Sequence, residues 1–176
     1  MWCCSTGAGV PTHKQFKVAV TKDNLVFASA HFITFPGHRC ERLHGHNYRT
    51  RVVVEGGLNR EAHYVLDFAE LKHLMKRLTD EIDHKVLLPL QNPKIEVREE
   101  GDTVSVAVMG RPRYVFPRDD CALLPVPNTT VEMLAQYLAG RVRQELAGSG
   151  DLDLTALEVE VEETIGQAAT YRESLG

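Results

Sequence analysis

The sequence lacks any apolar run that approaches the roughly 20 residues a helix needs to cross a bilayer. Its first residues, Met-Trp-Cys-Cys-Ser-Thr-Gly, also lack a basic stretch leading into an apolar one, so we expect no secretion signal. Positive charge is not in excess, because 20 Lys and Arg face 24 Asp and Glu, for a formal net charge of −4. That balance disfavours nucleic acid or an anionic membrane as a partner. We therefore expect a cytoplasmic protein with no nucleic-acid and no membrane partner.

A disulfide framework is absent as well. The four cysteines, Cys3, Cys4, Cys40 and Cys121, show no repeated spacing, so we expect free thiols. The chain also lacks internal repeats and any linker that would divide it, and its 176 residues suit one hydrophobic core. We expect residues 1–14 to form a flexible leader and residues 15–176 to form a single domain.

Apolar periodicity predicts both strands and helices. Strands are predicted at 16–20, 25–31, 44–55 and 154–163. A turn at 22–24 indicates that the first two strands pair with each other. Helices are predicted from Asp67 and from Thr129, each with a glutamate at capping-box spacing, and a β-hairpin is predicted at 95–108. The fold class is therefore α+β with a mainly antiparallel sheet.

Three histidines are candidate metal ligands. His44 and His46 lie two residues apart on a predicted strand, so both side chains leave the same face. His31 ends another predicted strand and can complete the set. Three neutral imidazoles with an open fourth position are typical of catalytic zinc. Histidines at this spacing are also common as solvated or hydrogen-bonded residues, so spacing alone leaves both interpretations open.

Other polar residues are candidates for catalysis or binding. Cys40, four residues before His44, suits a nucleophile or proton acceptor near a metal, a fourth metal ligand, or an inert buried thiol. Asp83 and His84 follow the first helix and suit general acid–base work or a favourable charge at a helix end. Glu163 falls on the apolar side of the last strand. There it needs a ligand with a guanidine-like edge, unless the strand has ended and the carboxylate is solvated.

Six segments together resemble one family in content and order. They are Phe27-Ala28-Ser29-Ala30-His31, Cys40-Glu41-Arg42-Leu43-His44-Gly45-His46-Asn47-Tyr48, Leu66-Asp67-Phe68-Ala69-Glu70-Leu71-Lys72, Asp83-His84, Thr130-Val131-Glu132 and Val161-Glu162-Glu163-Thr164. In this order they resemble the 6-pyruvoyltetrahydropterin synthase and 6-carboxytetrahydropterin synthase family. The resemblance covers most of the chain outside the leader and the hairpin.

The resemblance implies the tunnelling fold, a four-stranded antiparallel sheet with two helices on one face. It implies a homo-oligomer, a trimer or a hexamer, with active sites between subunits. It implies Zn²⁺ bound by His31, His44 and His46. It also implies a proton relay by Cys40, Asp83 and His84.

The resemblance further implies a lyase that acts on a small-molecule pterin, 7,8-dihydroneopterin triphosphate. Glu163 would hold the 2-amino and ring N–H edge of the pterin, with Thr129 and Thr130 nearby. Thr129 also suits a helix cap, so its binding role and its structural role both stand. The alternatives are 6-pyruvoyltetrahydropterin synthase activity, a non-catalytic pterin-binding homologue, and a structural zinc protein closed by Cys40.

Two adjacent residues bear on the product. Cys40, four residues before His44, resembles the carboxy-forming branch, which makes 6-carboxy-5,6,7,8-tetrahydropterin and releases acetaldehyde and triphosphate on the way to queuosine, a 7-deazapurine. Glu41, three residues before His44, resembles the folate-linked branch, which leaves 6-hydroxymethyl-dihydropterin, although a solvated loop carboxylate also fits. The chain carries both residues, as do members that serve both pathways.

Two features depart from the family pattern. The segment from about 89 to 127 is longer than the connection in compact bacterial members, and its hairpin inserts strands to which the sequence assigns no role. Thr129 stands where many members have proline.

Overall fold

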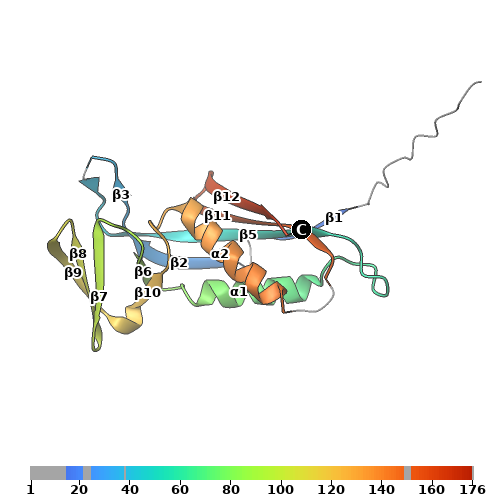
Figure 1. Cartoon of the computed structure of the whole chain (residues 1–176), viewed down its shortest axis with the longest axis horizontal. Helices are drawn as coiled ribbons and strands as arrows, with labels where there is room; N and C mark the ends of the chain where they lie inside the picture. Colours follow the sequence, from blue (N-terminus) through green and yellow to red (C-terminus); the bar gives the residue numbers. More distant parts are fainter. Residues whose placement is uncertain (1–14, 22–24, 38, 149–151, 176) are drawn as a thin grey trace, which may run out of the picture.

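The computed structural model describes residues 15–21, 25–37, 39–148 and 152–175 (Figure 1). Residues 1–14 lie outside this range, so the expected leader and single domain stay predictions. The elements are β1 (Phe16–Val20), β2 (Val26–His31), β3 (Thr34–Phe35), β4 (Arg39–Cys40), β5 (His44–Gly56), α1 (Phe68–Asp80), β6 (Lys85–Pro89), β7 (Ile95–Glu100), β8 (Thr103–Val108), β9 (Arg111–Pro117), η2 (Arg118–Asp120), β10 (Cys121–Leu124), α2 (Val131–Leu146), β11 (Leu154–Thr164) and β12 (Gln167–Ser174).

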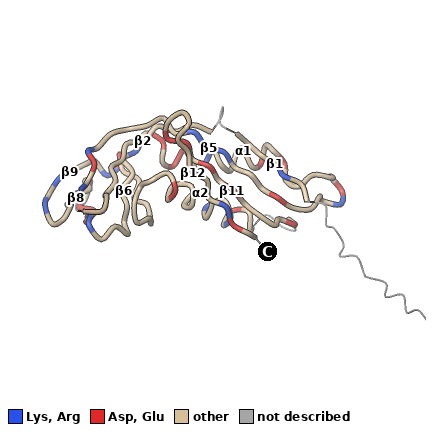
Figure 2. The backbone as a smooth tube through the Cα atoms, turned by 90° about the horizontal axis from the view of Figure 1, so that it is seen from above, with Lys and Arg blue, Asp and Glu red and all other residues tan. Residues whose placement is uncertain are grey.

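The central sheet has the order β10-β6-β2-β5-β11-β12, with β1 also paired to β5. The four strands expected from the sequence, β1, β2, β5 and β11, form its centre and pair antiparallel. Three further strands widen it: β12 pairs antiparallel with β11, while β6 and β10 add parallel pairs at the other edge. The sheet curls, as the view from above shows (Figure 2). The tunnelling fold with α+β composition is thus confirmed.

The expected pairing of the first two strands with each other is wrong. β1 and β2 both run antiparallel to β5, and each pairs with a different part of it: Val20 lies opposite Val52, and Val26 opposite Arg49. The two strands therefore point the same way along one side of β5 and form no hairpin. β5 has 13 residues and is long enough to pair with both β1 and β2. The turn residues at 22–24 do not reveal this arrangement.

Both helices cover one face of the central sheet (Figure 1). Asp67 caps α1 as expected, because its carboxylate accepts from Ala69 N at 2.6 Å. The expected start of α2 at Thr129 is wrong, since the helix begins at Val131 with Thr130 as its N-cap and no side-chain capping bond. The main core lies between these helices and the sheet and includes Tyr48, which is fully buried. None of the helices in the described part of the chain is long and apolar enough to span a membrane.

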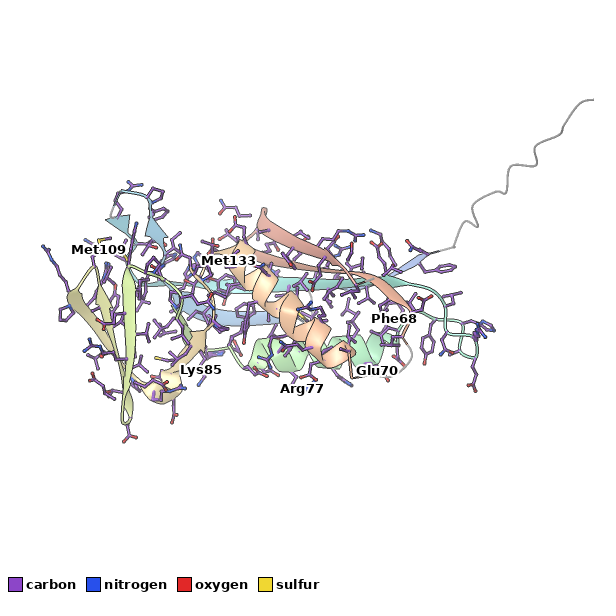
Figure 3. The ribbon with its side chains drawn as sticks, viewed as in Figure 1. Phe68, Glu70, Arg77, Lys85, Met109 and Met133 are labelled. Atoms are coloured by element: carbon purple, nitrogen blue, oxygen red, sulfur yellow. The ribbon has the colours of Figure 1, made fainter. Side chains whose placement is uncertain are left out.

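Residues 95–117 form a separate three-stranded sheet, β7-β8-β9, at the end of the molecule away from α1 and α2 (Figure 1). The hairpin expected at 95–108 is present as β7 and β8. The third strand, β9, did not stand out because prolines occupy its second and last positions, and proline cannot donate to a ladder. Here β9 is an edge strand, where proline is tolerated. A second core joins this sheet to β6 and β10, close to Lys85 and Met109 (Figure 3).

Glu55, near the end of β5, forms ion pairs with residues of β1 and β12. Its carboxylate lies 2.6 Å from Lys17 Nζ and accepts from Arg172 Nη1 and Nη2 at 2.6 and 3.1 Å. The Arg172 and Lys17 hydrogen bonds lower the pKa of Glu55 from 4.5 to about 2. A carboxyl group whose pKa is lowered in the folded state stabilises that state above its unfolded pKa and loses the effect as pH falls toward its folded pKa.

We therefore expect Glu55→Gln to lower the free energy of unfolding at pH 7 by about 1–2 kcal/mol, a value reduced for the solvent exposure of both cations. The difference from the unmodified chain is expected to shrink steadily between pH 4.5 and about 2, where the native carboxyl group protonates. Urea unfolding at one protein concentration, repeated across this pH range, measures both. A gap of equal size at pH 7 and pH 2.5 would contradict the ion-pair explanation.

Candidate metal centre and active site

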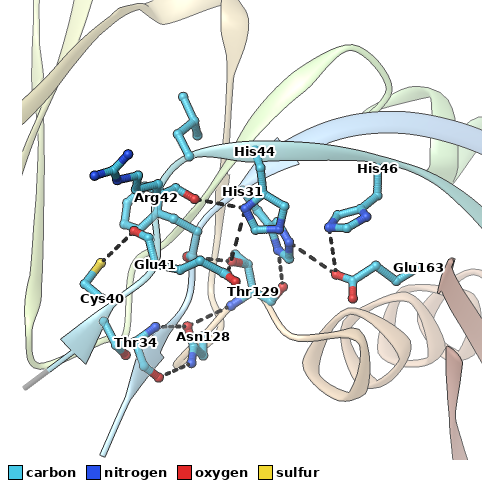
Figure 4. Close-up of polar contacts among 12 residues, drawn as sticks. His31, Thr34, Cys40, Glu41, Arg42, His44, His46, Asn128, Thr129 and Glu163 are labelled. Atoms are coloured by element: carbon cyan, nitrogen blue, oxygen red, sulfur yellow. Dashed lines mark hydrogen bonds and ion pairs between the residues drawn. The ribbon is translucent and has the colours of Figure 1, made fainter. Parts of the chain in front are cut away.

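Two neighbouring strands bring the three histidines together. His31 ends β2 and lies opposite His44, the first residue of β5, while His46 lies opposite Ser29. Because β-strand side chains alternate, His44 and His46 leave the same face of β5 (Figure 4). A Cβ on Gly45 would lie 3.3 Å from the Ser29 carbonyl oxygen, so glycine between the two histidines keeps β2 close. One nitrogen from each ring lies within 4.8 Å of the others.

Backbone carbonyls orient two of the three rings. His31 Nδ1 lies 2.8 Å from the Thr129 carbonyl oxygen, and His44 Nδ1 lies 2.9 Å from that of Arg42 (Figure 4). A carbonyl oxygen only accepts, so each Nδ1 carries the hydrogen and each Nε2 keeps its lone pair. Metal-binding histidines are typically held in this way. Burial also lowers the pKa of His31, which favours the neutral ring that binds metal.

The cluster fits a metal ion. His31 Nε2 and His46 Nε2 are buried and have no hydrogen-bond partner. A buried polar atom without a partner is costly, and a cation among the three nitrogens would satisfy both of these. The cluster of possible metal ligands among the described residues contains the three histidines and not Cys40. That composition leaves a coordination position open and disfavours a structural site closed by the thiol.

Glu163, near the end of β11, lies at the edge of the cluster. Its Oε1 is 3.2 Å from His31 Nε2 and 3.5 Å from His46 Nε2, and its side chain is 23% exposed. The carboxylate therefore faces the histidines, and it also helps burial to raise the pKa of Tyr48. It lies where it can accept hydrogen bonds from a ligand bound beside the cluster. Contact with a pterin stays a prediction.

Cys40 ends β4, and Glu41 begins the short segment that joins β4 to β5. Glu41 Oε2 lies 3.9 Å from His44 Nδ1, at the border of the cluster. The Cys40 Sγ atom lies 3.5 Å from the Glu41 carbonyl oxygen. Burial raises the pKa of the Cys40 thiol, and the nearby Arg113 guanidinium opposes that rise. Both side chains are thus close to the histidines along the chain, with the carboxylate nearer in space to His44.

Asp83 and His84 pair with each other near the first residues of β6. Their predicted part in a proton relay stays a prediction. Asp83 Oδ2 lies 3.0 Å from His84 Nδ1, and Asp83 Oδ1 accepts from Ala28 N at 2.7 Å. Burial opposes ionisation of Asp83, but the Ala28 hydrogen bond and His84 prevail and lower its pKa. His84 has a φ of 56° and an 82% exposed side chain. Among the described contacts of this pair, none joins it to Cys40 or to the histidine cluster.

The sequence did not predict the groups that orient the histidine cluster. Thr129 supplies its carbonyl oxygen to His31, and its hydroxyl donates to the Phe32 carbonyl oxygen at 3.2 Å. Asn128 holds this turn, because its Oδ1 accepts from Thr34 N and Thr129 N at 3.3 and 3.2 Å. The polar residues before α2 were the only sequence signal for this turn, because every residue has a backbone carbonyl group whatever its type. Pterin binding by Thr129 and Thr130 stays a prediction.

Comparison with known proteins agrees with this geometry. A family model described as 6-pyruvoyl tetrahydropterin synthase matches residues 20–174. A Methanocaldococcus jannaschii protein assigned as a 6-carboxy-5,6,7,8-tetrahydropterin synthase is 35% identical over 151 residues, or 86% of this chain and 91% of that protein. The dihydroneopterin monophosphate aldolase of Pyrococcus furiosus is 37% identical over 71 residues, or 40% of this chain and 59% of the aldolase.

A solved structure is similar over nearly the whole chain. Plasmodium vivax 6-pyruvoyltetrahydropterin synthase, solved with a catalytic glutamate replaced by alanine or cysteine, superposes with a TM-score of 0.84 at 27% identity. The match covers 92% of this chain and 99% of that one. The unmatched part is shorter than the segment 89–127, so at least some of this segment has a counterpart there.

Proposed function

The chain belongs to the 6-pyruvoyl tetrahydropterin synthase family, and we propose that it is a zinc-dependent lyase that converts 7,8-dihydroneopterin triphosphate to 6-carboxy-5,6,7,8-tetrahydropterin. The observation that carries this proposal is the cluster of three histidines, in which two buried Nε2 atoms take part in no hydrogen bond. The relative in Methanocaldococcus jannaschii, matched over most of both chains, supports the carboxy product. In this proposal the product leads to queuosine and other 7-deazapurines.

His31, His44 and His46 would hold the zinc ion. Zinc, when bound, lowers the pKa of ligand hydroxyl groups and polarises a developing carbonyl group. The carboxylate of Glu163 would accept two N–H groups from the pterin edge and so orient the ring beside the cluster. Cys40 and Glu41 would exchange protons with the substrate side chain. The 3.9 Å between Glu41 Oε2 and His44 Nδ1 supports this role for Glu41, and the contact of the Cys40 thiol with the Glu41 carbonyl oxygen keeps the thiol in the same segment.

The pair of Asp83 and His84 would serve the site of a neighbouring copy in a trimer or hexamer. Two features support this assembly. The His84 side chain is 82% exposed although it is held by Asp83, and the pair has no described contact with the cluster of its own chain. The central sheet ends in β10 and β12, and such strand edges are able to pair with another chain.

A second candidate function is cleavage of the side chain to 6-hydroxymethyl-dihydropterin, which feeds folate synthesis. Two relatives favour it: the Pyrococcus furiosus protein is named an aldolase of dihydroneopterin monophosphate, and the Plasmodium vivax protein has a catalytic glutamate. We propose that Glu41 fills that role here. A 6-pyruvoyl product remains the alternative to both.

Incubation of the zinc-loaded, full-length chain with 7,8-dihydroneopterin triphosphate tests the proposal. We expect 6-carboxy-5,6,7,8-tetrahydropterin and acetaldehyde in equal amounts, identified by mass spectrometry, and loss of both products after chelation of the metal. Added zinc is expected to restore them. Tight pterin binding without turnover would contradict the proposal and favour a binding protein, whereas a pyruvoyl product would contradict only the assigned product.

A further inference from the structure

The sheet β7-β8-β9 contacts the segment that carries Cys40 and Glu41. Arg113, in β9, donates from Nη2 to the Glu41 carbonyl oxygen at 2.9 Å. The Tyr114 hydroxyl oxygen accepts from Leu43 N at 3.3 Å and from Arg113 Nε at 3.1 Å. Two adjacent side chains of β9 thus bind the backbone on both sides of Arg42, whose carbonyl oxygen lies 2.9 Å from His44 Nδ1.

The same tyrosine also contacts Phe32, the residue that follows β2. Its ring lies 5.4 Å from the ring of Phe32, centroid to centroid, and stacks on Phe116 at the same distance. Phe32 is fully buried and directly follows His31. Tyr114 therefore packs on the residue that follows one candidate metal ligand, His31, and binds the backbone of the residue that precedes another, His44. Cys40 and Leu43 pack against the core of this sheet as well.

From these contacts we infer that Arg113 and Tyr114 are positioning residues. They hold the 41–43 backbone so that the Cys40 thiol, the Glu41 carboxylate and the His44 ring keep their places. The segment 89–127 thereby acquires a role in the site, although its own side chains need not touch the substrate. The effect expected on turnover rests on the proposed function, whereas the effect expected on the backbone does not.

Backbone hydrogen exchange of the full-length protein tests the inference without any substrate. Tyr114→Phe keeps the ring but removes the oxygen that accepts from Leu43 N, and Arg113→Gln removes the guanidinium bound to Glu41. We expect exchange of amides 41–44 to rise about five- to tenfold in each variant, the size of one lost hydrogen bond. Exchange in β7 and β8 is expected to stay unchanged. Arg113→Lys, which keeps one donor and the charge, is expected to restore part of the protection.

Arg98→Gln is the matched control, because it removes a guanidinium from β7 that pairs with Glu96 on the same strand. In turnover assays we expect Arg113→Gln and Tyr114→Phe to lower kcat about tenfold with KM within twofold, since misplaced catalytic groups slow the chemical step. Unchanged exchange at 41–44, or faster exchange spread evenly over β7, β8 and β9, would overturn the inference. If the unmodified chain turns over no pterin, the proposed function fails, and localised exchange still supports the positioning role.

Discussion

Replacing His46 with alanine is expected to abolish tight metal binding and to lower kcat/KM by at least about a thousandfold, which corresponds to roughly 4 kcal/mol of lost transition-state stabilisation. His46 is the suitable ligand to remove because its side chain is 20% exposed, whereas His31 is almost fully buried. The shortened side chain leaves two histidine ligands. Metal content by mass spectrometry and steady-state kinetics measure the two effects.

His73→Ala provides the matched control, because His73 lies exposed on α1, outside the cluster. We expect this variant to bind one metal ion per chain and to turn over substrate at the normal rate. The thermal midpoint of metal-free His46→Ala is expected to equal that of the metal-free parent chain, since removal of a partly exposed imidazole leaves the core intact. Retention of one metal ion and of activity in His46→Ala would show that the cluster is not the metal site.

The histidine cluster could be predicted because it depends on local geometry. A two-residue repeat on one strand fixes the shared face of His44 and His46 whatever lies elsewhere in the fold. His31 then required only that β2 and β5 be neighbours. The alternation of side chains along a strand says nothing of the segments around these three residues. The resemblance to a pterin synthase family supplied the order of those segments.

The parts that the sequence did not reveal depend on distant partners. The pairing of β1 with β5 rather than with β2 is a choice between two antiparallel pairings that the local pattern allows equally. Thr129 has the residue type of a helix cap, but its hydroxyl binds Phe32 instead and its carbonyl oxygen serves His31. Backbone carbonyls carry no sequence signal, so the groups that orient the histidine rings could be identified only from the folded chain.

The sequence could predict that Asp83 and His84 act together, but not where the pair lies relative to Cys40. Their adjacency follows from the sequence, and the hydrogen bond from Ala28 N fixes the carboxylate. In the proposed assembly, their relation to Cys40 would be set by the surface that a neighbouring copy covers. An exposed but well-held His84 is therefore informative, because an ordered polar group at a surface has a fixed direction to offer a partner.

Cys40 and Glu41 are expected to control different products. Cys40→Ala should lower formation of the carboxy product by about a hundredfold or more, the usual contribution of a general acid or base. Glu41→Gln should lower only the hydroxymethyl product by a similar factor, because the amide keeps the shape of the side chain but loses the basic oxygen near His44. Product ratios from a single substrate, measured by mass spectrometry, separate the two effects from any change in overall stability.

The positions of the two side chains allow the role of each residue to be tested separately. The Glu41 carboxylate lies 3.9 Å from His44 Nδ1, whereas the Cys40 thiol lies against the Glu41 carbonyl oxygen. In the proposed reaction, the two groups would therefore approach the substrate side chain from different positions. Glu61→Gln, which changes an exposed carboxylate of the loop between β5 and α1, is the control and should leave both products unchanged. Loss of both products in either Cys40→Ala or Glu41→Gln would instead mean that the two residues act as one proton relay for a single reaction.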